Sequence, residues 1–520
     1  MLHSLVWLIP LLPLLPLLAA GWIGLSMVVG WQAGEPGERA TARVAMAAVL
    51  MPLLLLLLLD ISALFRAAPG QLVFGSWLAS GDYRILISFT LDAFGLSMAT
   101  LVALICLLTL AFSVDYMHRE AGFQRFFMIL SLFSAAMLLL VTAGNAVLAF
   151  IGWELAGVSS YLLIGYVYER KTAGANATRA FVTNKIGDTG FILGIALGFL
   201  WLGGVEWPQM ATGSGEVEPL FNGLIGLGFL LAALVKSAQV PFTPWISRAL
   251  EGPTPSSAVF YGSLMVHAGV FLVIRLEPLF AQVQALLILA GLLGLMTALY
   301  GWLVGLVQTD IKSALIFATI AQVGLMFLEC GLGWFELAAW HLALHAAWRS
   351  YQFLHAPALL QLLSGPGPCA PAWLRRRTRL HAAAVQRFWL DAMADWLLLR
   401  PTHALAQDLQ DFDQRVVTRM VGLPDQAGNL NSLARWEALR QGRGDVDTAV
   451  GHGRGMAGRL MEWLAKVLYW FEEHLVLQGA GEGLKRAIDL LGGYLKRIEE
   501  LLGQPRYLLL LIMATFAVII

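Results

Sequence analysis

The 520-residue sequence contains few charged residues. Asp, Glu, Lys and Arg together make up 13% of the chain, whereas hydrophobic residues make up 58%. Because roughly a quarter of the residues in a soluble globular protein are charged, this composition excludes an ordinary soluble domain. Segments of alternating polarity, which a transmembrane β-barrel requires, are also missing. Long apolar runs recur instead, and they predict an all-α polytopic membrane protein.

Cysteine is scarce as well. Cys106, Cys330 and Cys369 lie far apart and form no CxxC pair, which argues against iron–sulfur sites, zinc sites and a disulfide scaffold. No GxGxxG motif follows a predicted strand, and no motif indicates a flavin or a quinone. We therefore expect no metal site, no cofactor and no redox or hydrolytic site in this chain, which argues against an enzyme.

Neither sign of charge dominates the sequence. The 34 Lys and Arg residues balance the 34 Asp and Glu residues, and no basic block suggests a nucleic acid partner. The opening stretch, MLHSLVWLIPLLPLLPLLAAGW, has no basic segment before its apolar run. It therefore predicts a retained first span and not a cleaved signal peptide.

About eleven apolar segments are long enough to cross the bilayer as helices. Two shorter segments, QLVFGSW and YRILISF, flank a few Gly, Ser and Asp residues and predict a small surface hairpin. The predicted spans cover residues 5–30, 44–65, 91–114, 126–143, 147–168, 181–202, 220–246, 256–274, 285–307, 311–330 and 335–360.

Basic residues gather in the loops on one side of these spans. The positive-inside rule assigns that side to the cytoplasm, so we expect the N-terminus to face outward. The outward loops carry few basic residues: Arg66, Arg84 and Arg275. The cytoplasmic loops carry Arg39, Arg43, Arg119, Arg125, Arg170, Lys171, Arg179, Arg248, Lys312 and the run RRRTR from Arg375.

The composition divides the chain into five parts. One apolar stripe, at spacings of four and three residues from Leu484 to Leu502, predicts an amphipathic helix. Such a helix lies on a membrane surface or a partner, or equally packs on the chain's own loops. The parts are N-terminal helices with the hairpin (1–90), a membrane core (91–362), a polar cytoplasmic region (363–455), the amphipathic helix region (456–503) and an anchor span (504–520).

Four ionisable residues fall inside two early spans and one middle span. A charge at mid-bilayer costs at least ~2.5–3.5 kcal/mol, so each needs a partner or a function. Lys185 and Asp188 are three residues apart, on one helix face, and can pair. Glu154 and Lys236 are the other two. These residues are candidates for a proton path.

Two prolines follow Lys236 and predict a broken helix. Pro241 has no N–H group, so the carbonyl of Ser237 loses its helical donor, and Pro244 comes three residues later. Within a membrane a break must be buried in protein or line water. We therefore expect Lys236 beside a hydrated gap, where it can gain and lose a proton. The alternative is a permanently charged Lys236 paired with Glu154 or Asp188.

Histidines occupy the later spans. His267 can relay protons near neutral pH, or it can be a packing residue. His341, His345 and Arg349 are spaced four residues apart on one helix face. An arginine on that face repels a cation, so a proton relay is favoured over a metal site. Because Arg349 keeps its proton, it can modulate neighbouring charges but cannot carry the proton itself.

Six segments in this order resemble the core motifs of antiporter-like proton-conducting membrane subunits. That family includes subunit 5 of respiratory complex I, the large Mrp antiporter subunit and the membrane subunit of DAB-type inorganic-carbon uptake complexes. The resemblance covers about residues 92–360. The segments are GWELAGVSSYLLIGY, NKIGDTGFILG, LVKSAQVPFTPW, EGPTPSSA, QTDIKSALIFATIAQVG and HLALHAAWRSYQFL.

This resemblance implies roles for the residues already singled out. Glu154 matches the family's membrane glutamate, Lys236 matches the lysine of its broken helix, and His341 and His345 match its later polar axis. Three departures stand out. Tyr261 replaces a usual histidine, and Arg349 replaces a usual lysine. The sequence after residue 360 is polar, so the second of the family's inverted repeats is predicted to be truncated. The amphipathic helix and anchor span would match the family's lateral helix.

The resemblance implies proton conduction coupled to a partner's reaction in a bacterial inner membrane. We favour inorganic-carbon uptake, because a chain that contains only half of the family's proton path must deliver its proton to something else. The partner would be a soluble, DabA-like cytoplasmic protein that resembles a carbonic anhydrase and holds zinc. A redox-driven pump or an Mrp-type cation/proton antiporter is the alternative. A non-conducting membrane scaffold is a third hypothesis.

Overall fold

The computed structural model describes residues 7–31, 34–65, 68–80, 83–213, 215, 217–362, 370–413, 463 and 467. The predicted stripe at 484–502, the anchor span at 504–520 and Cys369 lie outside these residues. The chain forms two compact units, of which the first includes Met1–Ala394 and the second is Asp395–Leu510. The described helices of the second unit are η4 (Asp395–Leu399) and α20 (Arg400–Phe412).

Ten of the described helical segments are long and apolar enough to cross a membrane, which confirms the polytopic helical fold. They correspond to the first ten predicted spans. Their bounds are α2 (Leu11–Val29), α3 (Glu35–Ala63), α4 (Ala93–Tyr116), α5 (Phe123–Thr142), α6 (Ala146–Ile164), α7 (Lys171–Leu202), α9 (Pro219–Lys236), a composite segment (Thr254–Arg275), α14 (Gln284–Gly305) and α15 (Ile311–Gly331).

The composite segment is not one regular helix. It joins a π-helix and a 3₁₀ turn between two α-helical pieces, and its residues are buried along the whole length. Such irregular turns often mark functional positions within helices. The pieces are α11 (Thr254–Ser257), η1 (Ala258–Ser263), η2 (Met265–His267) and α12 (Ala268–Arg275).

The eleventh predicted span is also a helix, α16 (Phe335–Leu362). With 28 residues it is about 42 Å long at 1.5 Å per residue. It is not among the ten apolar segments, because histidines, an arginine and a glutamate interrupt its hydrophobic sequence. It packs against α4, α15 and the composite segment, and its residues His345, Arg349 and Ser350 are buried within the bundle.

Small residues let neighbouring helices approach closely. Where α14 crosses α15, a Cβ atom added to Gly294 would lie 2.6 Å from the carbonyl oxygen of Gly324. Where α7 crosses α9, a Cβ atom on Gly190 would lie 2.7 Å from the carbonyl oxygen of Gly228. Lipid gives helices no hydrophobic reason to associate, so close packing of this kind contributes much of the attraction.

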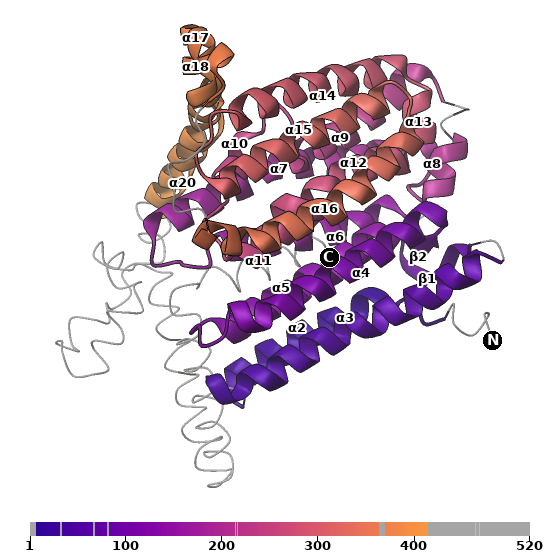
Figure 1. Cartoon of the computed structure of the whole chain (residues 1–520). Coiled ribbons are helices and arrows are strands. Elements are labelled where there is room, and N and C mark those ends of the chain that lie inside the picture. The colour runs from indigo at the N-terminus through magenta and orange to yellow at the C-terminus, as the bar shows by residue number, and fades with distance from the viewer. Residues whose placement is uncertain are drawn as a thin grey trace. The chain divides into compact units, whose positions relative to one another are not determined.

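The two ends of the bundle differ (Figure 1). The strands β1 (Gly70–Ser80) and β2 (Tyr83–Leu91), with the short helices α8 (Trp207–Gly213) and α13 (Glu277–Ala281), lie at one end, which we call the hairpin end. The opposite end, which we call the basic end, carries α11 and three further helices. These are α10 (Pro244–Ser247), α17 (Ala372–Arg376) and α18 (Thr378–Val385).

The chain after α16 returns to the basic end of the first unit. The turn η3 (Arg387–Trp389) leads into α19 (Leu390–Ala394). Asp391 of α19 accepts a hydrogen bond of 2.8 Å from Nη2 of Arg248, which follows α10. Residues 372–394 therefore belong to the same compact unit as the membrane helices.

The hairpin that the sequence predicts is present, with β1 and β2 antiparallel, and a buried glutamate fastens it to the bundle. Glu206, between α7 and α8, accepts hydrogen bonds from Ser88 Oγ (2.6 Å), Gln71 Nε2 (2.8 Å) and Asn145 Nδ2 (2.8 Å). Burial raises the pKa of Glu206, and these hydrogen bonds offset only part of the rise. One carboxylate thus joins the hairpin to the start of α6.

The raised pKa of Glu206 makes the hairpin's attachment depend on pH. Folded Glu206 holds its proton more tightly than the unfolded residue, so the free energy of unfolding should fall as pH rises above the ordinary glutamate range. Glu206→Gln should flatten this dependence, because an amide cannot lose a proton. Thermal unfolding of both forms in detergent at several pH values tests this, and equal pH slopes would contradict it.

Candidate functional site

Two buried carboxylates share one lysine at the centre of the predicted proton path. Lys185 Nζ on α7 forms an ion pair with Glu154 Oε2 on α6 and lies 3.1 Å from Asp188 Oδ2, one turn further along α7. Glu154 and Asp188 are each 5% exposed, whereas the Lys185 side chain is 40% exposed. Trp153 Nε1 donates a hydrogen bond of 3.0 Å to Asp188 Oδ1. The predicted pairing of Lys185 with Asp188 therefore forms, and Glu154 joins it.

Lys236 lies next to these residues but does not take the ion-pair position. Its Nζ atom donates a hydrogen bond of 3.1 Å to the carbonyl oxygen of Trp153 and lies 4.8 Å from the centre of the Trp153 ring. The residue is 2% exposed. Space is tight, since a Cβ atom on Gly157 of α6 would lie 3.3 Å from Nζ. Lys185, and not Lys236, therefore holds both carboxylates in this structure.

The helix breaks where the prolines predict. α9 ends at Lys236, and α10 begins at Pro244 after a turn that contains Pro241. Ala238 in this turn has a positive φ of 50°, a conformation that L-residues seldom adopt. A charged side chain thus sits on the last helical turn before an irregular segment buried inside the bundle.

Side chains replace the hydrogen bonds that the break removes. Gln239 Nε2 donates to the carbonyl oxygen of Ser237 at 2.9 Å, the group that Pro241 leaves without a helical donor. Trp245 Nε1 donates to the carbonyl oxygen of Val235 at 2.9 Å. The break is therefore satisfied by protein groups, as irregular backbone at membrane depth requires. Water beside Lys236 stays a prediction.

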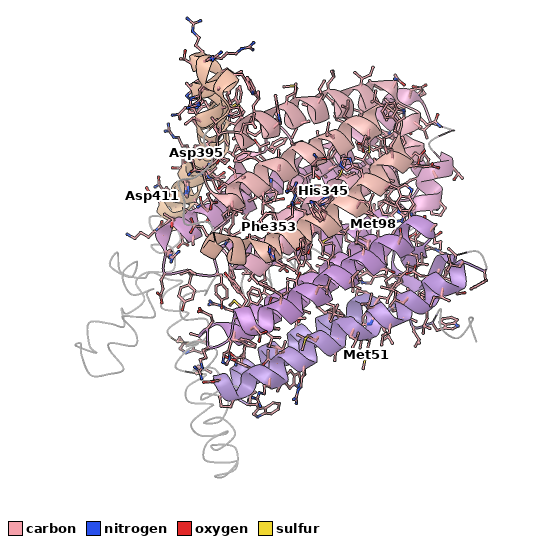
Figure 2. The ribbon with its side chains drawn as sticks, in the orientation of Figure 1. Met51, Met98, His345, Phe353, Asp395 and Asp411 are labelled. Atoms are coloured by element: carbon pink, nitrogen blue, oxygen red, sulfur yellow. The ribbon has the colours of Figure 1, made fainter. Side chains whose placement is uncertain are left out.

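A second polar cluster joins the composite segment to α16. His267 Nε2 lies 2.9 Å from His345 Nδ1, and both residues are buried. Figure 2 shows His345 within the bundle, near the middle of α16. Arg349, 7% exposed, extends its Nε and Nη2 atoms to within 3.4 Å of His345 Nε2. The spacing of four residues therefore does place Arg349 beside His345.

His341 lies on the next turn of α16 and has different neighbours. Its Nδ1 atom lies 2.9 Å from Glu329 Oε1, and its Nε2 atom lies 3.0 Å from Gln322 Oε1. The rings of His341 and His345 are 6.1 Å apart, centre to centre. The predicted relay residues therefore meet in space, with Glu329 and Gln322 of α15 as additional members. Among the described residues, no group of three His, Cys, Asp or Glu side chains can hold a metal.

The close contact between α9 and α12 brings the two clusters together. A side chain on Gly269 of α12 would overlap the carbonyl oxygen of Ala233 and the hydroxyl of Ser237. Gly269 follows His267 by two residues, and Ser237 follows Lys236 by one. The break in α9 therefore lies between the lysine cluster and the histidine cluster.

The sequence of this region matches a known family. Residues 143–361 match the family model of the NADH:quinone oxidoreductase/Mrp antiporter membrane region. Residues 77–127 match that of the N-terminus of NADH-ubiquinone oxidoreductase (complex I) chain 5. These matches make residues 77–127 and 143–361 similar to the membrane regions of complex I and Mrp subunits that the two models describe. Every proton-path residue that the sequence predicts lies within the first matched segment.

Individual proteins of these complexes are similar to part of the chain. NAD(P)H-quinone oxidoreductase subunit 5 from the chloroplast of Ipomoea purpurea is 38% identical over 309 residues, which cover 58% of this chain and 43% of the relative. The corresponding subunit from the chromatophore of Paulinella chromatophora is 36% identical over 303 residues, 57% of this chain and 45% of the relative. The chain therefore spans less than half the length of these curated relatives.

Solved structures share the fold of the antiporter-like core. The Mrp complex from Dietzia sp. DQ12-45-1b contains a chain that is 25% identical, with a TM-score of 0.56, over 66% of this chain and 37% of that one. A chain of the membrane-bound sulfane sulfur reductase, an archaeal respiratory membrane complex, has a TM-score of 0.58 at 19% identity, over 69% of this chain and 57% of that one. The second likeness shows the fold alone.

Sequence interpretation missed some members of the antiporter-like site. Glu329 is a carboxylate inside the predicted span 311–330, so the criterion that found Glu154 applies to it equally. Gln322 and Trp153 carry no charge, and although each lies inside a motif quoted above, the motif alone gave neither residue a role. Their roles come from neighbours on other helices, which only the structure reveals.

The ion pair of Lys185 predicts a stability effect. Lys185→Ala removes the ion-pair partner of two buried carboxylates, so the free energy of unfolding should fall. Loss of a fully buried partner costs ~3–5 kcal/mol, and we expect less here because Lys185 is 40% exposed. Lys171→Ala, at the exposed start of the same helix, is the matched control. Thermal unfolding in detergent measures the difference, and equal stability of the two variants would contradict the prediction.

Proposed function

We propose that this chain is a proton-conducting subunit of a complex I-like or Mrp-like membrane complex. The observation that carries the proposal is the arrangement around Lys185. Two buried carboxylates share this half-exposed lysine, while Lys236 lies beside them at a helix break and forms no ion pair with any residue that the structure describes. A permanently charged structural pair does not require a second, unpaired lysine at a broken helix.

The arrangement supports a specific order of proton binding. Glu154 and Asp188 act as acid–base partners of Lys185, and Lys236 receives the proton at the break. Burial favours the neutral form of Lys236, whereas the nearby carboxylates favour its charged form. A small movement of Lys185 toward Asp188 therefore changes the charge that Glu154 presents to Lys236. His267, His345 and His341 continue the path beyond the break.

Unsatisfied buried atoms support the same path. Glu154 Oε1, Ser237 Oγ and His267 Nδ1 are buried and have no hydrogen-bond partner among the described residues. Each such atom costs free energy in a purely structural role. The three belong to consecutive parts of the proposed path, from α6 through the break in α9 to the composite segment.

The comparisons favour the alternative hypothesis about the partner over inorganic-carbon uptake. The relatives named above belong to quinone-linked and Mrp complexes. We therefore propose that this chain acts in a multi-subunit membrane complex. The bacterial inner membrane, with the basic end toward the cytoplasm, stays a proposal that rests on the basic residues of the loops. Carbon uptake, with a DabA-like zinc partner, stays a second candidate. Its support is the polar segment after α16, which packs on the basic end through Arg248 and Asp391.

Removing either charge at the break should stop proton conduction. Glu154→Gln and Lys236→Ala both lower the cost of membrane burial, so insertion should survive while proton flux is lost. Glu169→Gln, on the exposed loop before α7, is the matched control and should conduct normally. Proton flux is measured with a pH-sensitive dye in membrane vesicles. Wild-type flux from fully inserted Glu154→Gln and Lys236→Ala would support the scaffold hypothesis instead.

The partner can be identified by purifying the full chain together with the proteins bound to it. Purification by an affinity tag on this subunit should retrieve quinone-oxidoreductase or Mrp-type subunits, and the purified complex in liposomes should conduct protons faster than the chain alone. A soluble zinc protein in their place would favour carbon uptake. Equal, fast flux from the isolated chain would contradict the dependence on a partner.

A further inference from the structure

Glu329 is a partly buried carboxylate that the path described so far does not use. It lies on the last turns of α15, and its side chain is 16% exposed. Both of its oxygen atoms approach His341 Nδ1, at 2.9 Å and 3.2 Å. No family motif quoted above contains this residue, and its contact with His341 joins two helices.

The surroundings of His341 suit the protonated imidazolium. A charged histidine donates from both ring nitrogens. Here Nδ1 faces the Glu329 carboxylate, and Nε2 faces the side-chain oxygen of Gln322. The carboxylate also supplies the opposite charge, which makes the hydrogen bond charge-assisted and stronger than a neutral one. A proton on His341 is therefore stabilised from both sides.

The surroundings of His345 have the opposite effect. The Arg349 guanidinium can only donate, so His345 Nε2 must accept and the His345 proton lies on Nδ1. That N–H then donates to His267 Nε2, which leaves the His267 proton on Nδ1. A second proton on His345 would place two positive charges side by side. Among the three histidines, His341 is therefore the one at which an extra proton comes to rest.

This resting place lies toward the hairpin end of the bundle. α15 ends at Gly331 and α16 begins at Phe335, at the end that α13 occupies in Figure 1. Two further carboxylates lie at this end, Glu277 on α13 and Glu336 on the first turn of α16. Burial, together with the charge of Glu336, raises the pKa of Glu277. The basic loops lie at the other end, so the positive-inside rule makes the hairpin end the outward one.

We propose that Glu329 and His341 form the outward-facing proton site of this subunit, which rests on the proposed proton-conducting function. A proton on His341 Nδ1 passes to a Glu329 oxygen, which then releases it on the outward side. Arg349 keeps His345, the next histidine toward the cytoplasmic side, neutral, and so disfavours the return of the proton. Glu329 acts as a proton-binding residue and not merely as a packing contact.

The test compares proton flux in membrane vesicles that hold the full chain with its native partners. Glu329→Gln keeps the shape and removes the proton-binding group, so flux should fall roughly tenfold or more. Glu329→Asp keeps a carboxylate and should retain part of the flux, which a packing role does not predict. Glu218→Gln, an exposed charge change just before α9, should conduct like wild type. Should Glu329→Gln fail to insert, Glu329→Ala replaces it with the same expected loss.

Parallel measurement of Glu154→Gln separates this inference from the function on which it rests. Flux lost in both Glu154→Gln and Glu329→Gln, with partial flux in Glu329→Asp, supports the outward site. Flux lost in Glu154→Gln but normal in Glu329→Gln overturns the outward site and leaves proton conduction standing. Normal flux in both variants overturns both proposals.

Discussion

The structure depends on the sharing of one lysine by two carboxylates inside the membrane. Glu154 and Asp188 would each be costly to bury as isolated charges, and Lys185 lowers that cost only while α6 and α7 stay in contact. The same pairing fixes Trp153, whose indole binds Asp188 and whose carbonyl binds Lys236. The hydrogen bond from Lys236 to the Trp153 carbonyl therefore links the last turn of α9 to the residues of this ion pair.

The broken helix is a second consequence of burial. Every backbone group released by the prolines must find a partner within protein, because lipid offers none. Gln239 and Trp245 supply two donors from within the broken segment itself. Thr297 of α14 accepts from the backbone N–H of Val240 at 2.9 Å, which fastens the segment to a neighbouring helix. The break is thus held in one arrangement, and Lys236 is presented from a fixed place although its own charge has no ion-pair partner.

Sequence patterns predict what depends on one helix at a time. Span length, the hairpin, the position of the break and the pairing of Lys185 with Asp188 all follow from composition or local spacing. Which lysine pairs with Glu154 is different, because two lysines on two helices satisfy the same charge rule. Only the relative placement of α6, α7 and α9 decides between them. The polar residues of α16 are a similar case. They lower the hydropathy of the helix, and their partners lie on other helices, which the sequence of α16 does not identify.

The histidine cluster carries opposite charges at its two ends, and this order would give the proposed proton path a direction. At the inner end of the histidine cluster, Arg349 contributes a positive charge that no ordinary pH removes. At the outer end, Glu329 contributes a carboxylate against His341. Replacing the usual family lysine by arginine makes the first of these charges permanent. A titratable lysine at that position would exchange the proton with its neighbours, whereas arginine only repels it. In the proposed path, this difference in charge between the two ends would favour one direction of proton transfer.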